Sequence, residues 1–160
     1  MTDSHVELPR TDAEPELLGN TDFEAFRRLN DLPIGMTAHV LYEKIDPDQC
    51  ATLSPKLIEI IREDIGFDGL LLTDDLSMSA LSGSFSERTV RALSAGCDVA
   101  LHCNGDPDEM QQIAGVAGEM TAAAARRARQ ALLQRSPRRE IDPAPLLAEL
   151  DELLMLGGDE

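Results

Sequence analysis

Apolar residues along the chain fall into short runs that alternate with longer segments of helical spacing. The three runs extend from Leu32 to Val40, from Gly69 to Thr73, and from Asp98 to Cys103. Each run has the length of one strand, and the residues that follow repeat their apolar positions every three or four places, as on the buried face of a helix. This alternation predicts parallel βα units and therefore an α/β fold.

Polar residues and glycines mark where the helical segments begin and end. Capping boxes are expected at Thr21 with Glu24 and at Ser84 with Glu87, a serine–proline start at Ser54–Pro55, and glycine stops at Gly66 and Gly96. Further along, Asp106 and Pro107 predict one long helix that runs to Gln134, and a last helix is expected from Pro143 to Met155. The opening segment, Met1 to Asn20, contains two prolines and several acids and is expected to be loop.

Three strands are too few to close a barrel on their own. A complete (β/α)₈ barrel uses eight strands and about 250 residues, whereas this chain has 160 residues. The pattern therefore predicts either a portion of a larger α/β unit or a small open sheet.

The net charge argues against some classes of binding partner, and the cysteine content predicts the cellular compartment. The chain carries 14 Lys and Arg against 30 Asp and Glu, for a net charge of -16, which repels nucleic acid and anionic membrane surfaces. A basic patch from Arg126 to Arg139 is expected to be a solvated helix face. Three cysteines, an odd number without Cys-x-x-Cys spacing, and the lack of a basic-then-apolar leader predict a reduced cytoplasmic protein. Cys97 and Cys103 are expected to be buried.

Two carboxylates directly follow the second apolar run, at Asp74 and Asp75. The carboxyl ends of parallel strands are where α/β folds keep their chemistry, so one carboxylate there suits a nucleophile or a metal ligand. Successive side chains leave a strand on opposite sides, so the other carboxylate is expected to bind backbone amides or to cap the next turn. The alternative is that the pair only caps the following helix.

Histidines provide the candidates for proton transfer. Asp3 and His5 lie two residues apart, so the carboxylate could orient and polarise the imidazole; the alternative is an exposed loop histidine. His39 ends the first apolar run and either lines a pocket, where it would bind substrate, or makes hydrogen bonds within the strand ends. His102 beside Cys103 matches no standard metal spacing, and a structural role is favoured.

Four motifs in one order give the sequence a family resemblance. They are Met36–Val40, Gly66–Gly69, Asp74–Met78 and Ala95–Asp98. In this arrangement the chain resembles the bacterial β-N-acetylglucosaminidases of glycoside hydrolase family 3, from about Asp3 to Asn104.

The resemblance implies a fold and an activity. Members have a TIM barrel and release N-acetylglucosamine from peptidoglycan fragments in the cytoplasm during cell-wall recycling, with retention of configuration. Carried over, Asp74 would be the nucleophile, His5 the general acid/base and Asp3 its partner. No cofactor and no metal is expected.

The resemblance also implies what accompanies this segment in the family. The family's barrel has about five strands and a Lys-His-Phe-Pro-Gly-His-Gly element before the Asp-x-His loop, which here begins at Asp3. We therefore expect a C-terminal portion of a TIM barrel with about three parallel strands over residues 1–135, then a linker and helix over 136–160. Such a piece would self-associate or need the missing N-terminal half, and its activity alone is in question. Two alternatives are an interaction or structural remnant, and a magnesium-dependent phosphotransfer site at Asp74 and Asp75.

Overall fold

The computed structural model of the chain describes residues 3–135 and 142–156. The strands are β1 (Arg10–Thr11), β2 (Ile34–Met36), β3 (Leu41–Tyr42), β4 (Leu70–Asp75) and β5 (Val99–Leu101). The α-helices are α1 (Pro15–Asn20), α2 (Asp22–Arg27), α3 (Pro55–Glu59), α4 (Phe85–Ala95), α5 (Pro107–Ala117), α6 (Ala122–Leu133) and α7 (Pro143–Leu156). A 3₁₀ turn, η1 (Ala51–Leu53), precedes α3, and a π-helical turn, η2 (Ile60–Asp64), continues it.

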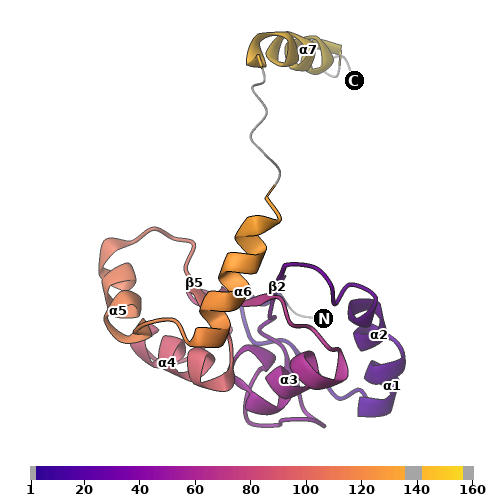
Figure 1. The fold of residues 1–160 in the computed structure, drawn as a ribbon, viewed down its shortest axis with the longest axis vertical. Helices are drawn as coiled ribbons and strands as arrows, with labels where there is room; N and C mark the ends of the chain where they lie inside the picture. Colours follow the sequence, from indigo (N-terminus) through magenta and orange to yellow (C-terminus); the bar gives the residue numbers. More distant parts are fainter. Residues whose placement is uncertain (1–2, 136–141, 157–160) are drawn as a thin grey trace.

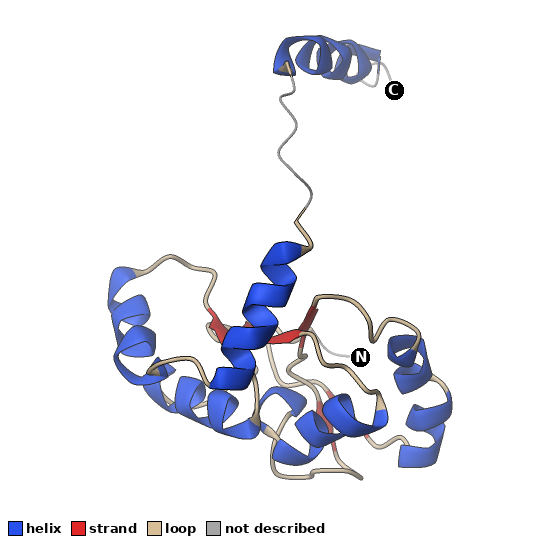
Figure 2. Cartoon of the chain, viewed as in Figure 1, coloured by secondary structure: helices blue, strands red, loops and turns tan. Residues whose placement is uncertain are grey.

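The three predicted strands form one parallel sheet in the order β2-β4-β5. Figure 2 shows the strands between the helix pair α4 and α5 on one side and the pair α1 and α2 on the other. Along β4, Leu71 and Thr73 are buried while Leu70 and Leu72 are only partly so. Ile34 and Met36 on the neighbouring strand β2 are 51% and 54% exposed. The sheet therefore has one buried face and keeps exposed apolar side chains on β2, at its edge.

The opening segment is not all loop, and the prediction for Met1 to Asn20 is wrong in part. β1 pairs in parallel with β3, with Arg10 opposite Leu41, and α1 begins at Pro15. Two-residue strands exist only because of the tertiary pairing between them, which a local apolar pattern does not reveal.

The helix starts at Ser54 and Ser84 are confirmed, and the one at Thr21 is not a capping box. Ser54 accepts a hydrogen bond from the amide of Leu57, and Ser84 forms the full reciprocal box with its glutamate. The hydroxyl of Thr21 instead donates to the carbonyl of Leu17 at the end of α1. The glutamate expected to complete that box pairs with Arg27 and Arg28 instead, and Thr21 is both the C-cap of α1 and the N-cap of α2.

The single helix expected from Pro107 to Gln134 is two helices. Gly118 ends α5 with a φ of 66°, a conformation that favours glycine. Thr121 then starts α6 by accepting a hydrogen bond from the amide of Ala124 at 3.1 Å. The predicted final helix is confirmed as α7, whose described side chains are exposed, and Figure 1 shows it apart from the other helices. The expected linker at 136–141 lies outside the described residues.

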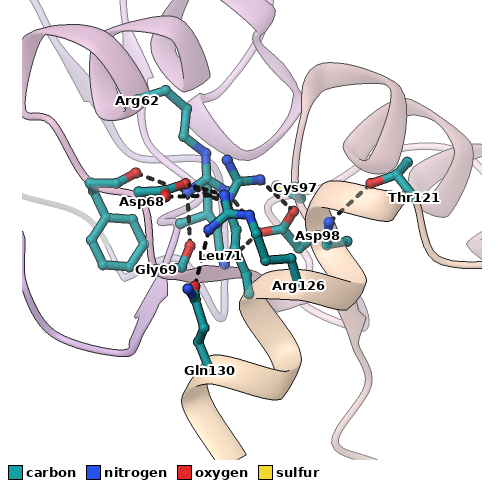
Figure 3. A network of polar contacts seen from close by, with 12 residues as sticks. Arg62, Asp68, Gly69, Leu71, Cys97, Asp98, Thr121, Arg126 and Gln130 are labelled. Carbon is teal, nitrogen blue, oxygen red and sulfur yellow. Dashed lines mark hydrogen bonds and ion pairs between the residues drawn. The ribbon is translucent and has the colours of Figure 1, made fainter.

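Arg126 and Arg127 of α6 clamp the amino ends of the strands, which corrects the prediction of a solvated face for these two residues. Arg129 and Arg135 are exposed as predicted, and Arg138 and Arg139 lie outside the described residues. Arg127 bonds Asp68 at 2.9 Å and Asp98 at 3.0 Å, and Asp98 also binds Arg62 at 2.7 Å. Figure 3 shows Arg62 of η2 and Arg126 of α6 converging with Asp68 and Asp98, which precede β4 and β5. Bonds from Arg126 and Arg127 lower the pKa of Asp68 to about 2.

Small apolar clusters hold the helices against the buried side of the sheet. Leu71, Ile58 and Phe67 belong to one cluster, and Leu76 with Ala92 to another. Cysteines contribute to both. Cys50 and Cys97 are buried as small apolar residues, and burial raises the pKa of the Cys97 thiol to about 12. Cys103 is exposed, which corrects the expectation of burial, because it follows the end of β5.

Among the described helices, none combines the length and apolar character needed to cross a membrane.

Candidate active site at the carboxyl ends of the strands

The carboxyl end of β4 contains a β-bulge. The pairing register shifts between Leu72 and Asp75, so that three steps along β4 match two along β5. Fully buried Thr73 occupies this irregularity, and its hydroxyl accepts a hydrogen bond from the amide of Leu101 at 2.8 Å. Bulges re-aim the side chains that follow them. The acidic pair therefore begins where the strand departs from regular pleating.

The two acids of the pair have different roles, as the sequence predicts. The carboxylate of Asp75 accepts hydrogen bonds from the amide of Ser77 at 3.0 Å and from the amide of Cys103 at 3.2 Å. It also accepts one from the Ser77 hydroxyl. Burial opposes its ionisation, but these hydrogen bonds outweigh that effect and leave the pKa of Asp75 lowered. Asp75 is thus committed to the turn after β4 and to the end of β5.

The carboxylate of Asp74 has more freedom to react. Its Oδ1 accepts a hydrogen bond from the amide of Asp75 at 2.8 Å, which fixes the direction of the side chain. Within the described residues its Oδ2 makes no hydrogen bond to protein. The alternative of a magnesium site shared by the two acids gains no support from this arrangement, because the carboxylate of Asp75 is already occupied.

Asp3 and His5 form the pair that the sequence predicts. Nδ1 of His5 lies 2.8 Å from Oδ1 of Asp3, and the amide of His5 donates to the same oxygen at 2.9 Å. The hydrogen bond to the imidazole, together with the charge of Asp3, raises the pKa of His5. The pair is exposed, so its orientation comes from these local bonds and not from burial.

Electrostatics link this pair to the end of β4. The negative charges of Asp74 and Asp75 also raise the pKa of His5, so the imidazole lies within electrostatic reach of both carboxylates. A carboxylate with one unoccupied oxygen and an imidazole whose raised pKa favours its protonated form are the components of paired nucleophilic and acid/base catalysis. Residues 3–135 and 142–156 contain no cluster of three or more His, Cys, Asp or Glu suited to a metal ion.

His39 lies inside the fold, next to the carboxyl end of β4. Its side chain is fully buried, with Nδ1 2.8 Å from the hydroxyl of Thr52 and Nε2 2.9 Å from the carbonyl oxygen of Asp75. Of the two alternatives given by the sequence, this geometry corresponds to hydrogen bonding within the strand ends. Substrate contact would require one of these two bonds to break.

Sequence reasoning missed the buried hydroxyls around His39. Thr37 and Thr52 are 5% and 0% exposed, and their hydroxyl oxygens are 2.8 Å apart. A threonine in the middle of the apolar run before His39 was the available signal, since a buried hydroxyl needs a partner. The side chain of His102, for which a structural role is favoured, is 6% exposed, and its Nε2 lies 3.2 Å from a carboxylate oxygen of Glu109 without forming a hydrogen bond.

A well-formed apolar hollow lies elsewhere, between α2, β2 and α3. Its volume is about 290 Å³, and its lining includes Phe26, Ile34 and Leu57 but not Asp3, His5 or Asp74. The hollow lies against β2, which is an edge strand of the sheet. It therefore continues the exposed apolar surface of β2, and neither Asp74 nor Asp75 lines it.

Comparison with known proteins gives this arrangement a family context. The family model described as the glycosyl hydrolase family 3 N-terminal domain matches residues 1–134. A protein named beta-hexosaminidase from Methylobacillus flagellatus is 36% identical over 117 residues, covering 71% of this chain and 33% of its own length. The chain thus spans about a third of the length of the curated relatives it matches.

Solved structures agree with the sequence comparison. The glycoside hydrolase family 3 beta-N-acetylglucosaminidase from a Paenibacillus strain superposes with a TM-score of 0.71 at 26% identity, covering 88% of this chain and 30% of that one. NagZ from Neisseria gonorrhoeae, in complex with N-trifluoroacetyl-D-glucosamine, superposes with a TM-score of 0.68 at 30% identity, covering 83% and 42%. The parallel strands and helices described above are therefore those of this barrel-forming domain.

Proposed function

The chain belongs to glycosyl hydrolase family 3, and from this premise we propose that it carries the catalytic centre of a retaining β-N-acetylhexosaminidase. One observation carries the proposal: Asp74 presents a carboxylate at the end of β4 within electrostatic reach of an imidazole that Asp3 orients. In the proposal Asp74 is the nucleophile, His5 the general acid and base, and Asp3 the residue that holds His5.

The reaction proceeds in two displacements at the anomeric carbon. In the first, an oxygen of Asp74 bonds to this carbon while the bond to the leaving oxygen breaks, and protonated His5 transfers its proton to that oxygen. In the second, neutral His5 takes a proton from water as the water oxygen attacks the glycosyl ester, which releases Asp74. The raised pKa of His5 suits the first step, since it keeps the imidazole protonated to higher pH.

The proposed substrate is an N-acetylglucosamine unit in peptidoglycan-derived fragments. Support comes from the names of the relatives, beta-hexosaminidase and beta-N-acetylglucosaminidase, and from the N-acylated glucosamine analogue bound to the Neisseria gonorrhoeae protein. Release of this sugar during cell-wall recycling would take place in the cytoplasm, a location supported by the free cysteines of the described residues.

We also propose which portion of the barrel this chain supplies. A closed barrel needs eight parallel strands, and the three strands β2, β4 and β5 form a sheet with edges at β2 and β5. In the proposal residues 1–135 provide the C-terminal part of the barrel, and further strands from elsewhere complete the wall beside β2. The exposed apolar side chains of Ile34 and Met36 support the presence of a further strand beside β2.

The experiment that tests the activity follows release of a chromogenic aglycone from an N-acetyl-β-D-glucosaminide by the purified chain. We expect turnover that Asp74→Asn and His5→Ala reduce by at least about a hundredfold. Asp31→Asn, an exposed acid outside the strand ends, is the control and keeps wild-type turnover. Mass spectrometry of rapidly quenched enzyme should find the glycosyl ester on the peptide that contains Asp74. Turnover that is equal in Asp74→Asn and wild type would refute the assignment.

A second candidate function is favoured by the exposed surface at β2. Here the chain acts as an interaction or structural piece that pairs through Ile34 and Met36 with a chain carrying the remaining strands, or with itself. Analytical ultracentrifugation distinguishes the two cases: a concentration-dependent oligomer that Met36→Lys converts to monomer, with no turnover in any sample, would favour the second function. A monomer with turnover would exclude it.

A further inference from the structure

A closed loop of hydrogen bonds runs from the main chain of Asp74 through three buried side chains to the main chain of Asp75. The amide of Asp74 donates to the hydroxyl of Thr37 at 3.3 Å. The hydroxyls of Thr37 and Thr52 are 2.8 Å apart, and that of Thr52 is 2.8 Å from Nδ1 of His39. Nε2 of His39 completes the loop 2.9 Å from the carbonyl oxygen of Asp75.

The donors and acceptors of this loop can be ordered from its two ends. A carbonyl oxygen only accepts, so Nε2 of His39 must carry a proton. An amide only donates, so the hydroxyl of Thr37 accepts at that end and is free to donate to Thr52. Neither neighbour of the His39 ring is charged, and a buried charge without a counter-ion is costly. In a neutral ring Nδ1 is then an acceptor, and the Thr52 hydroxyl donates a hydrogen bond to it.

We propose that Thr37, Thr52 and His39 form a one-way relay of hydrogen bonds that positions the carboxylate of Asp74 by gripping both ends of the Asp74–Asp75 segment. The relay runs from the Asp74 amide through the two hydroxyls to Nδ1 of a neutral His39, and from its Nε2–H to the Asp75 carbonyl. These three residues are positioning residues and touch no substrate.

The relay reaches the carboxylate through the peptide unit between the two acids. The amide of Asp75 donates to Oδ1 of Asp74 at 2.8 Å, so the orientation of that peptide sets the direction of the carboxylate. The relay holds the amide before this peptide and the carbonyl after it. Because Thr37, Thr52 and His39 are buried, the two bonds that join these side chains are shielded from water, and each partner depends on the next.

The site gains a fixed nucleophile at a place where the strand is irregular. β4 departs from its register between Leu72 and Asp75, so the ladder alone does not define the direction of Asp74. Side-chain hydroxyls and an imidazole supply the missing constraint. The benefit to catalysis rests on the proposed function, whereas the relay itself is a property of the folded chain.

The first test reads the tautomer of His39 directly. The chain contains three histidines, and comparison with His39→Gln assigns its imidazole signals in a nitrogen-15 NMR spectrum of the purified chain. We expect a protonated Nε2 and an unprotonated Nδ1 at neutral pH. A proton on Nδ1 would reverse the donors and acceptors of the relay and overturn the proposal.

The second test measures coupling between Thr52 and the amide of Asp74, which do not touch. Thr52→Val keeps the shape of the side chain and removes the hydroxyl, while Thr52→Ser keeps the hydroxyl. We expect hydrogen exchange at the Asp74 amide to become about tenfold faster in Thr52→Val, equivalent to about 1.4 kcal/mol, and to stay near wild type in Thr52→Ser. The amide of Ala92, a fully buried residue of α4, serves as the reference for global unfolding.

Each outcome decides the proposal. If Thr52→Val leaves exchange at Asp74 unchanged relative to Ala92, the contacts are separate structural bonds and the relay is refuted. Thr37→Val provides the positive control, since it removes the direct acceptor. Asp74→Asn, which abolishes the proposed chemistry, is expected to leave the tautomer of His39 as in wild type. Failure of the glycosidase assay and failure of the relay are therefore distinguishable.

Discussion

One carboxylate oxygen, Oδ1 of Asp3, holds both the main chain and the ring of His5. The amide of His5 donates to it at 2.9 Å and Nδ1 lies 2.8 Å from it. The bond to this carboxylate directs the free Nε2 of the ring away from Asp3. An imidazole anchored at one nitrogen exposes only the other for proton transfer, as a general acid requires.

The pH behaviour of His5 should follow from this contact. Its pKa is raised above the ordinary value of 6.5, mainly by the hydrogen bond to Asp3 and then by its charge. The stabilising contribution of the pair is therefore complete below the unfolded pKa and is lost as the pH rises through the raised folded value. Asp3→Asn should lower the pKa of His5 in an NMR titration of its ring proton, and Asp12→Asn should not. An unchanged midpoint in Asp3→Asn would show that the pair is absent in solution.

Asp75 should matter for stability and Asp74 for chemistry. Asp75→Asn weakens the acceptor bonds from Ser77 and Cys103, so we expect the free energy of unfolding to fall by about 1–2 kcal/mol. Asp74→Asn keeps the single bond from the Asp75 amide through its amide oxygen, and we expect a change below about 0.5 kcal/mol. Urea denaturation followed by circular dichroism measures both. The reverse order of the two effects would contradict the assignment of roles.

Arg62 should be the strongest single support of the amino ends of β4 and β5. Its guanidinium bonds the carbonyls of Phe67 and Gly69 at 2.9 and 2.8 Å and Asp98 at 2.7 Å. Arg62→Met should cost about 3 kcal/mol of unfolding free energy, the lower end for a broken buried pair because another arginine still binds Asp98. The matched variant is Arg126→Gln, whose parent side chain is 43% exposed, with a cost below about 1 kcal/mol. Equal midpoints in urea for the two variants would count against the clamp.

Gly96 should tolerate no side chain. It ends α4 with a φ of 115°, and a Cβ there would lie 2.8 Å from Cγ2 of Ile58. Gly96→Ala combines backbone strain with a clash in the core and should lower the free energy of unfolding by about 2–4 kcal/mol. Gly105→Ala also starts from a positive φ, of 72°, but meets nothing within 4 Å, so only the strain of about 1 kcal/mol applies. Thermal unfolding of the two alanine variants should therefore differ by several degrees.

The sequence predicts the features that depend on neighbouring residues. The three apolar runs become the strands of one parallel sheet, the caps at Ser54 and Ser84 form, and α7 begins at Pro143. The difference between the two acids was also predicted, because alternation along a strand separates Asp74 from Asp75, whereas the bulge that contributes to their directions was not.

What the sequence could not predict depends on distant partners. β1 exists through its pairing with β3, and the cap expected at Thr21 is lost to the carbonyl of Leu17. The break at Gly118 was visible as a glycine three residues before a threonine, but the alanine-rich helix pattern around it suggested continuity. The environment of His39 required Thr52, which lies in a 3₁₀ turn without any strand pattern.

Because β4 contains a bulge, the number of residues in the strand, and not only their identities, determines which way the side chains at its end point. Between the pairs at Leu72 and Asp75, β4 uses one more residue than β5. Removing one residue here would realign the ladder and bring each following side chain to the opposite face. Placing Thr73, Asp74 and Asp75 on a regular strand would reproduce the residue identities of the site without its geometry. An engineered version must therefore keep the number of residues between the paired positions as well as their identities.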